Sequence, residues 1–308
     1  MPLEKTAIDI CIGTYQRPEM LKELLQSLEV QTSIENHDVR LIIVDNDPQK
    51  SAYPIVKSHQ TSSSFKIEYD VEPEKGISFV RNRAIRNVRA NYFAFIDDDE
   101  TADENWLATI YKTLIDQQAD IVFGPVVSLF PDDAPSWAKN NPCFKTKQKG
   151  TGTLLKTGAT NNVLIYTAAL GTPPQEFDPS FALTGGSDTE YFYRLFLAGK
   201  KLIFCDEAIV YEKVPLNRIT EKWILLRSFR KGQCYSRIFI QKYSKYRKLL
   251  WIFSMFFQIF SYLILMPVSR TRSFDAYFLL KFKLYAKMGQ LTGILGKTFL
   301  YKEYKYQH

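Results

Sequence analysis

Three aspartates, Asp97, Asp98 and Asp99, follow directly on a short apolar run at residues 92–96. Aromatic residues and isoleucine dominate this run and polar turn residues bound it, so the pattern predicts a buried β-strand. Open α/β sheets bind ligands just outside the carboxyl ends of their strands. Because adjacent carboxylates repel one another, this strand end predicts a site for a divalent cation and a phosphate. A solvated acidic turn that caps the next helix is the competing interpretation.

The first two thirds of the chain alternate predicted strands with predicted helices. Strands are expected at residues 7–12, 40–44, 65–69, 92–96 and 121–123, and helices at residues 18–28, 79–88 and 105–117. This alternation predicts an α/β fold with a largely parallel sheet and right-handed crossovers. Polar clusters follow three of the strands, at Thr14, Asp45 and Asp97, and we expect them to converge on one edge of the sheet.

Charge is distributed unevenly along the 308 residues. Residues 1–212 carry 21 Lys and Arg against 30 Asp and Glu, a net charge of −9, whereas residues 213–308 carry 19 against 3, a net charge of +16. A basic segment can face nucleic acid or an anionic membrane, and the apolar surroundings of these charges favour a membrane over nucleic acid. We therefore expect two domains, an α/β body at residues 1–212 and a helical membrane-associating region at residues 213–308.

An uncharged apolar run at residues 249–268 is long enough to cross a bilayer core of about 30 Å as a helix. Basic residues flank it on both sides, including Lys248 and Arg270, which fits a single span poorly. Gln258 and Pro267 within the run also weaken a straight lipid-facing helix. A span, a re-entrant hairpin, an in-plane helix and a buried soluble helix remain open at this point.

Two further segments have the pattern of interfacial helices. Residues 223–246 mix Arg and Lys with Trp, Leu, Phe and Tyr, and residues 274–295 place Phe278, Phe282 and Tyr285 at helical spacing among lysines. Both are predicted to lie on an anionic membrane surface. The amino terminus lacks the apolar core of a signal peptide, so we expect the protein at the cytoplasmic face of the inner membrane.

Histidine and cysteine offer little for catalysis. The four cysteines are scattered and are expected to be reduced, and three histidines leave almost no material for a zinc site or a Ser-His-Asp triad.

Five blocks in order resemble inverting family 2 glycosyltransferases of GT-A fold. The blocks are IDICIGTYQRPEMLKELLQSL, LIIVDND, EPEKGISFVRNRAI, YFAFIDDDE and TGGSDTEYFYRLFLAGKKLIFCDEAIVYEKVP, which cover about residues 7–240. Their residue patterns are most similar to those of bacterial exopolysaccharide glucosyltransferases of the ExoM-like subgroup. The resemblance implies a Rossmann-like, mainly parallel sheet with helices on both faces.

The resemblance also implies a nucleotide-sugar site along the strand ends. Thr14, Tyr15 and Arg17 are expected to line the base pocket, and Asp45 to accept a hydrogen bond from uracil or an equivalent base. Arg81 is expected to contact a phosphate or the base of the nucleotide sugar, Asp97 the ribose, and Asp98 to tune the site. Asn162 or its neighbour Asn161 is expected to bind sugar hydroxyls, and Gly185 and Gly186 to let the backbone approach the sugar closely.

Mg²⁺ or Mn²⁺ is the implied cofactor, with Asp99 as a ligand, as in DxD sites generally. Glu212 stands where many relatives have a metal-binding His, so either Glu212 replaces that ligand or the ion has fewer protein ligands. Asp188 is the implied catalytic base, which takes the proton of the acceptor hydroxyl. Glu190 is a lesser competitor, and a helix cap is the structural alternative for Asp188.

Together these features predict an enzyme that moves a sugar from a nucleotide sugar, expected to be a UDP-sugar, to a lipid-linked oligosaccharide or other glycan acceptor in bacterial surface polysaccharide synthesis. The expected partners are the donor, the acceptor and a membrane surface. A non-catalytic membrane adaptor that kept a nucleotide-binding fold is the alternative, and the presence of both Asp99 and Asp188 argues against it. The sequence leaves open the sugar, the base, the linkage and the oligomeric state.

Overall fold

The computed structural model describes residues 5–145, 148–294 and 296. The described residues divide into two compact units. The first, which we call the α/β unit, lies within Met1–Val127, Thr146–Ala182 and Ser187–Lys213. The second, the helical unit, lies within Ser128–Lys145, Leu183–Gly186 and Val214–His308. The domain boundary predicted at residue 212 stays a prediction.

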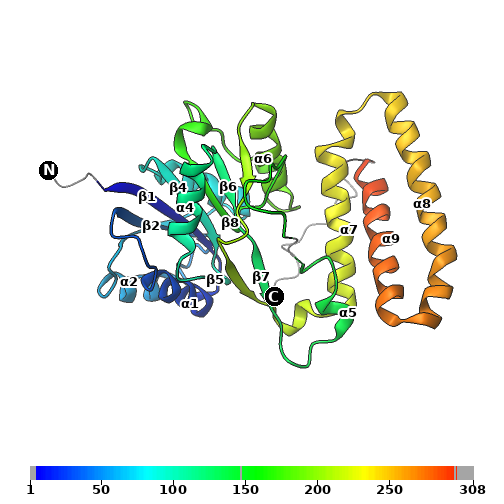
Figure 1. The fold of residues 1–308 in the computed structure, drawn as a ribbon, viewed down its shortest axis with the longest axis horizontal. Helices are drawn as coiled ribbons and strands as arrows, with labels where there is room; N and C mark the ends of the chain where they lie inside the picture. Colours follow the sequence, from blue (N-terminus) through cyan, green and yellow to red (C-terminus); the bar gives the residue numbers. More distant parts are fainter. Residues whose placement is uncertain (1–4, 146–147, 295, 297–308) are drawn as a thin grey trace. The chain divides into compact units, whose positions relative to one another are not determined.

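A seven-stranded sheet forms the centre of the α/β unit (Figure 1). In sheet order the strands are β3 (Lys66–Val71), β2 (His37–Asp45), β1 (Thr6–Thr14), β4 (Tyr92–Asp97), β8 (Asn162–Tyr166), β6 (Ile121–Phe123) and β9 (Leu202–Phe204). The first four are mutually parallel, as is the pair β6 and β9. β8 runs antiparallel to both of its neighbours. The predicted α/β fold with a largely parallel sheet is confirmed.

Helices cover both faces of this sheet, because alternate residues of each strand point to opposite sides. The helices are α1 (Pro18–Glu29), α2 (Tyr53–Gln60), α3 (Ile77–Asn87), α4 (Trp106–Asp116) and α6 (Ser187–Leu197). One apolar core joins the sheet to α1, α2 and α4, and a second joins it to α3 and α6. Ile10 and Cys11 show the alternation, since the first belongs to one core and the second to the other.

A small second sheet was not predicted from the sequence. Its order is β5 (Glu100–Ala102), β10 (Val210–Lys213) and β7 (Val126–Leu129). β5 and β10 pair antiparallel, with Glu212 opposite Glu100. This pairing brings a residue from late in the chain next to the aspartate triplet at the end of β4.

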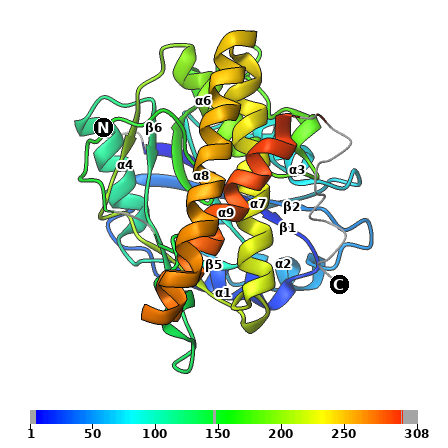
Figure 2. The same cartoon turned by 90° about the vertical axis from the view of Figure 1, so that its right-hand side faces the viewer.

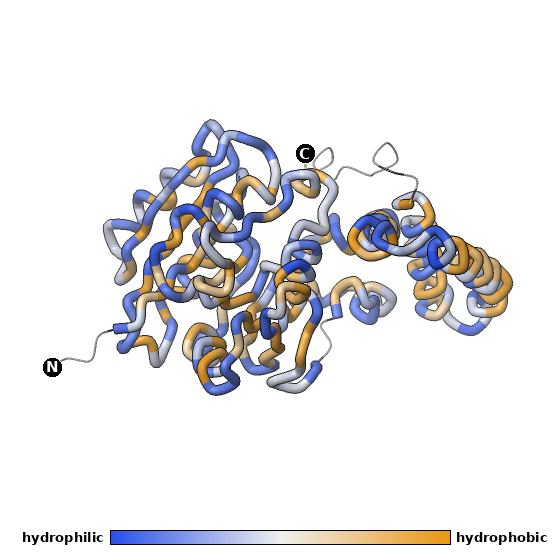
Figure 3. The backbone as a smooth tube through the Cα atoms, turned by 90° about the horizontal axis from the view of Figure 1, so that it is seen from above, coloured by the Kyte–Doolittle hydropathy of each residue, from blue (hydrophilic) through white to orange (hydrophobic). Residues whose placement is uncertain are grey.

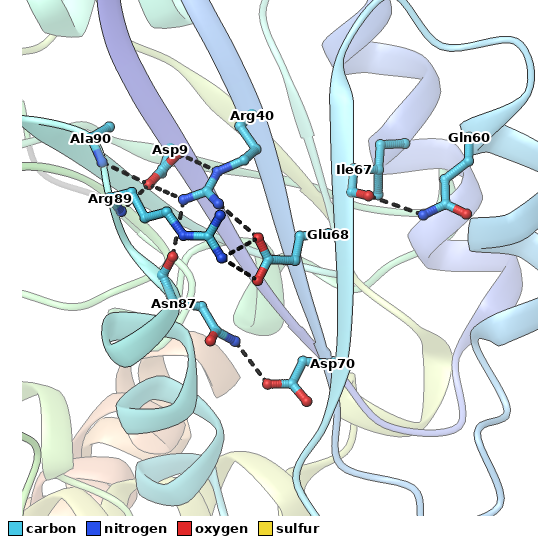
Figure 4. Close-up of polar contacts among 9 residues, drawn as sticks. All are labelled: Asp9, Arg40, Gln60, Ile67, Glu68, Asp70, Asn87, Arg89 and Ala90. Atoms are coloured by element: carbon cyan, nitrogen blue, oxygen red, sulfur yellow. Dashed lines mark hydrogen bonds and ion pairs between the residues drawn. The ribbon is translucent and has the colours of Figure 1, made fainter.

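A partly buried ion-pair network ties β1 to β2 and β3 (Figure 4). Arg40 donates to both oxygens of Asp9, at 2.9 and 2.7 Å, and to Glu68 at 2.7 Å. Asp9 also accepts the backbone N–H groups of Arg89 and Ala90, at 2.8 and 3.0 Å. The Asp9 side chain is almost fully buried, so its charge is stabilised by these four hydrogen bonds rather than by water.

Three long helices lie side by side in the helical unit (Figure 2). They are α7 (Glu221–Ile238), α8 (Lys245–Arg272) and α9 (Phe274–Ile294), and α9 packs against both of the others and against the short α5 (Ser136–Lys139). Short 3₁₀ helices occur at Thr167–Leu170, Pro179–Phe181, Leu216–Arg218 and Ile240–Lys242. Glycines let α7 and α9 approach at backbone distance, because a Cβ at Gly289 would overlap the carbonyl oxygen of Phe229.

Phe278, Phe282 and Tyr285 of the predicted stripe on α9 pack in the core of the helical unit, whereas Phe274 is exposed. Phe278 is 0% exposed and packs with Ile224 and Leu225 of α7, and Phe282 and Tyr285 flank the same core. The prediction that this stripe lies on a membrane surface is therefore wrong for Phe278, because helical spacing of aromatics fits a core between helices equally well. Leu295, at the end of the predicted stripe, lies outside the described residues.

Candidate functional site

The carboxyl ends of three neighbouring strands meet at one edge of the main sheet. Thr14, the last residue of β1, is in register with Asp45, the last residue of β2. Gly13 of β1 is in register with Asp97, the last residue of β4. The predicted convergence of these polar strand ends is confirmed, and it follows from the parallel pairing of β1 with both neighbours.

Asp98 and Asp99 are held by residues from the end of β1. The hydroxyl of Thr14 donates to Asp98 at 2.8 Å. The Arg17 guanidinium, just before α1, donates to one oxygen of Asp98 and one of Asp99, both at 3.2 Å. Arg17 thus lies on the aspartates, and its expected contact with a base stays a prediction.

Glu100 directly follows the aspartate triplet in the sequence, and its side chain is almost fully buried. Its carboxylate accepts the backbone N–H of Asp97 at 3.1 Å and the amide of Asn161 at 3.1 Å. Glu212 of β10 stands opposite Glu100 in the small sheet. Five carboxylates therefore gather here, from Asp97 through Glu100 together with Glu212.

This crowding disfavours full ionisation of the carboxylates. The pKa of Asp97 is raised to about 7, because burial and then the charges of Asp99, Asp98 and Glu212 outweigh the lowering effect of Arg81. Burial also raises the pKa of Asp98 to about 6, against the opposing effect of Arg17. The pKa of Glu100 lies well above its ordinary value, first because of burial and then because of Asp97. The site therefore attracts cations.

The donor set fits a hard divalent cation that is shared with a phosphate group. Among residues 5–145, 148–294 and 296, no group of three or more His, Cys, Asp or Glu side chains is arranged to hold a metal ion. Mg²⁺ commonly binds through only one or two carboxylates plus the phosphates of a substrate. Asp99, with or without Glu212, suits that arrangement, and both assignments stay predictions.

Arg81 connects this edge of the sheet to the start of α6. Its guanidinium donates to the hydroxyl of Ser187 at 3.0 Å and lies 5.5 Å from the centre of the Phe177 ring. Its charge also lowers the pKa of Asp97, as described above. Since Ser187 is the first residue of α6, Arg81 links the start of this helix to Asp97.

Asp188 and Glu190 both lie in the first turn of α6 but differ in their contacts. One oxygen of Asp188 accepts the backbone N–H of Thr189 at 2.7 Å, and the side chain is partly exposed. Both oxygens of Glu190 are held by Arg194, at 3.2 Å each. The ion pair gives Glu190 a structural role, which favours Asp188 as the reactive carboxylate.

Asp45 and Asn162 are both buried, and their side chains are hydrogen-bonded within the protein. Asp45 is 0% exposed and accepts hydrogen bonds from the backbone N–H groups of Asp47 and Ala52 and from the hydroxyl of Tyr69. Asn162 is 1% exposed, accepts the indole N–H of Trp106, and donates to the carbonyl oxygens of Pro125 and Ala208. These contacts argue for structural roles, and the expected contacts of both residues with a donor stay predictions.

Gly185 and Gly186 have backbone φ angles of +76° and +87°, which glycine adopts far more readily than other residues. They belong to the helical unit, where a Cβ would lie 2.8 Å from the end of the Arg230 side chain at Gly185 and 2.9 Å from the Cys234 side chain at Gly186. Their backbone conformation therefore has a packing reason, and their contact with a sugar stays a prediction.

Lys75, which lies near Tyr15, and Asn46, which holds the loop of Lys75, were not among the predicted site residues. The ammonium group of Lys75 lies 5.1 Å from the centre of the Tyr15 ring. Asn46 fixes the loop that carries Lys75, because its side chain donates to the carbonyl oxygens of Glu72 and Glu74 and accepts the N–H of Gly76. An asparagine directly after a predicted strand often forms hydrogen bonds to nearby backbone groups, so the sequence could have predicted that Asn46 holds a loop.

Comparison with known proteins agrees with this geometry. The model of the family "Glycosyl transferase family 2" matches residues 9–171, more than half of the chain. The succinoglycan biosynthesis protein ExoM of Rhizobium meliloti is 35% identical over 242 residues, which cover 79% of this chain and 78% of ExoM. The glycosyltransferase GlyA of Streptococcus pneumoniae is 29% identical over 38% of this chain and 16% of its own length.

Solved structures share the fold at low sequence identity. The mannosyltransferase PcManGT of Pyrobaculum calidifontis, solved with GDP-Man and Mn²⁺, superposes with a TM-score of 0.66 at 13% identity, over 94% of this chain and 88% of that protein. Residues 1–349 of S. aureus TarS in complex with UDP superpose with a TM-score of 0.54 at 13% identity, over 95% and 92% of the two chains. The expected GT-A architecture is confirmed.

Proposed function

The chain belongs to glycosyl transferase family 2, and from this membership we propose that it is a metal-dependent inverting glycosyltransferase that uses a nucleotide-sugar donor. The acceptor is a lipid-linked oligosaccharide or another glycan in the synthesis of a bacterial surface polysaccharide. One observation carries the proposal: the aspartate triplet, two arginines and the start of α6 meet at one edge of the sheet.

The donor diphosphate binds at the aspartate triplet. Arg17 and Arg81 are the cations next to the carboxylates, and they supply positive charge for the diphosphate when it arrives. Asp99 would hold Mg²⁺ or Mn²⁺, with Glu212 as the second candidate ligand. A divalent ion bound there would supply Lewis-acid stabilisation of the negative charge on the departing nucleotide.

Tyr15 and Lys75 form the outer wall of the donor site. An aromatic ring with a cation above it offers a stacking surface for a nucleobase and a positive charge near its phosphates. A UDP-sugar is the expected donor, in keeping with TarS, which has been solved with UDP and with UDP-GlcNAc. PcManGT with GDP-Man makes GDP-sugars the first alternative to test.

Asp188 takes the proton of the acceptor hydroxyl as that oxygen attacks the anomeric carbon, and the carbon–oxygen bond to the diphosphate breaks on the opposite face. Inversion needs one such base and no second nucleophilic carboxylate. The ion pair of Glu190 with Arg194 supports Asp188 in this role.

The family relationship also supports the expected biological setting. ExoM, the relative that matches 79% of this chain, is a protein of succinoglycan biosynthesis. We infer a related role in exopolysaccharide or other surface polysaccharide synthesis, at the cytoplasmic face of the inner membrane. Within the described residues, α8 is the one helix long and apolar enough to cross a membrane.

A donor screen tests the proposal. Purified full-length protein in detergent is incubated with UDP-, GDP- and TDP-sugars and Mn²⁺, and release of the nucleoside diphosphate is measured with and without a polyprenyl-diphosphate-linked glycan. We expect one donor to be consumed, faster with the acceptor present. Binding of nucleotide sugars without any turnover of them would instead support the adaptor that kept a nucleotide-binding fold.

A further inference from the structure

Helix α8 presents an apolar face that no other described residue covers. In its most apolar stretch of 18 residues, only 6% of the residues are buried. Figure 3 shows this helix at the right-hand edge, mostly in the orange of hydrophobic residues. We call its exposed side the outer face, defined by Phe253, Phe256, Phe257, Phe260, Leu263 and Ile264. An apolar patch of this kind marks an interaction surface.

The opposite side of α8 is packed. Met255 is 1% exposed, and the ring of Trp251 stacks 6.2 Å from that of Tyr235 on α7. α9 packs against α8 and, more closely, against α7, where Ser228 and Ser236 of α7 each donate to an α9 carbonyl at 2.7 Å. α8 is therefore one layer of a packed three-helix assembly rather than an isolated segment.

This packing argues against a transmembrane orientation. If α8 crossed a bilayer, α9 would be carried into the hydrocarbon beside it, together with Lys281, Lys283 and Lys287. Lys281 pairs with Glu221 of α7 at 2.9 Å, so α7 would follow. Charged side chains are strongly disfavoured in a bilayer core. An in-plane orientation keeps α7 and α9 on the aqueous side and buries only the outer face.

The charges at the ends of α8 favour the same orientation. Lys245 and Arg247 lie in its first turn and Arg270 and Arg272 in its last, and residues 222–274 contain no Asp or Glu. An in-plane helix places both basic ends on one anionic headgroup surface. A span would place one of them on the far side, against the tendency of basic residues to stay in the cytoplasm.

We propose that α8 lies in the plane of an anionic lipid bilayer, with its outer face inserted among the acyl chains and its basic ends on lipid phosphates. This attachment deepens the proposed function, which needs access to a lipid-linked acceptor. Its test, however, uses binding and topology rather than turnover. If sugar transfer failed while the membrane results below were obtained, the proposed function would be wrong and the attachment would stand.

Vesicle flotation tests the outer face. Full-length protein, exchanged from detergent, is mixed with vesicles of phosphatidylcholine with or without phosphatidylglycerol. We expect flotation to be strongest with phosphatidylglycerol and to fall at least about tenfold for Phe253→Glu/Phe257→Glu. The matched control Leu154→Glu/Leu197→Glu changes two residues of the α/β unit with similar exposure, and it should float like the wild type.

Wild-type flotation by Phe253→Glu/Phe257→Glu would overturn the proposal. A second result would also overturn it: the wild-type protein forms a dimer in lipid-free buffer and does not float with vesicles, and the same two substitutions convert the dimer to monomers. The outer face would then be covered by a second copy of the chain.

Cysteine labelling distinguishes the two orientations. Single cysteines are placed at Ser244 and Ser273, the residues that flank α8, in a protein with Cys143→Ala and Cys234→Ala. We expect a membrane-impermeant maleimide to label both positions in inside-out membrane vesicles and neither in right-side-out vesicles. Labelling of the two positions from opposite sides would show a span and overturn the proposal.

Discussion

Replacing Asp9 by Ala should strongly destabilise the α/β unit without touching the strand-end carboxylates. The substitution removes the acceptor of two hydrogen bonds from Arg40 and of two backbone N–H groups, all at 2.7 to 3.0 Å. Removing one partner of a buried ion pair costs about 3 to 5 kcal/mol, because the remaining charge and donors lose their partners. Glu68 still contacts Arg40, so we expect about 3 kcal/mol.

Hydrogen exchange of peptides from β1 and β2 measures this effect directly. A loss of about 3 kcal/mol corresponds to roughly 150-fold faster exchange of the protected amides. The control is Glu176→Ala, which removes a more exposed pair with Arg86 and should change exchange by only about twofold. Exchange of Asp9→Ala within threefold of the wild type would refute the reasoning.

The same pair predicts a pH dependence. Burial alone would raise the pKa of Asp9, but the Arg40 guanidinium and the two backbone N–H groups outweigh it, and the pKa lies below its ordinary value of 3.8. A lowered pKa gives stability that is present above the unfolded value and is lost as the pH falls through the folded value. The difference between the wild type and Asp9→Ala should therefore persist down to about pH 4 and shrink below it.

Three further predictions concern the site and the helical unit. EDTA and Asp99→Ala should each suppress sugar transfer, with Mn²⁺ or Mg²⁺ restoring only the chelated wild type; full activity in EDTA would exclude metal dependence. Gly289→Ala should lower the melting temperature of the helical unit by several degrees, because the new methyl group overlaps the Phe229 carbonyl. Asn162→Ala should cost about 2 kcal/mol of stability, measured by urea unfolding, and leave the KM for the donor unchanged.

The sequence predicted the elements whose signals are local. The strands around residues 7–12, 40–44 and 92–96 were found because each is a short apolar run that ends on polar residues, and the structure extends them to Thr6–Thr14, His37–Asp45 and Tyr92–Asp97. The convergence of Thr14, Asp45 and Asp97 then followed from parallel pairing alone.

Long-range pairing could not be predicted in this way. β8 enters the sheet antiparallel between β4 and β6, and β10 pairs with β5 from more than one hundred residues away. The sequence of a short apolar strand does not specify which other strand it will pair with. The burial of Asn162 at the first position of β8, and the place of Glu212 beside Glu100, both depend on these pairings.

The helical unit illustrates a second limit. An aromatic stripe at helical spacing fits a membrane surface or a helix core, and in α9 the core contains Phe278. Whether an apolar stripe is buried or exposed depends on which helix packs against it. α7 and α9 pack against each other, while the outer face of α8 is exposed.

We propose that Asp188 is the base of an inverting sugar transfer. The most direct measurement compares Asp188→Asn with Glu190→Gln in a transfer assay, with the Kd of the donor measured in parallel. Because the base acts on the acceptor in the transition state, Asp188→Asn should lower kcat by about 10²-fold or more and change the donor Kd less than about twofold. Glu190→Gln should retain most activity. An active Asp188→Asn beside an inactive Glu190→Gln would contradict the assignment.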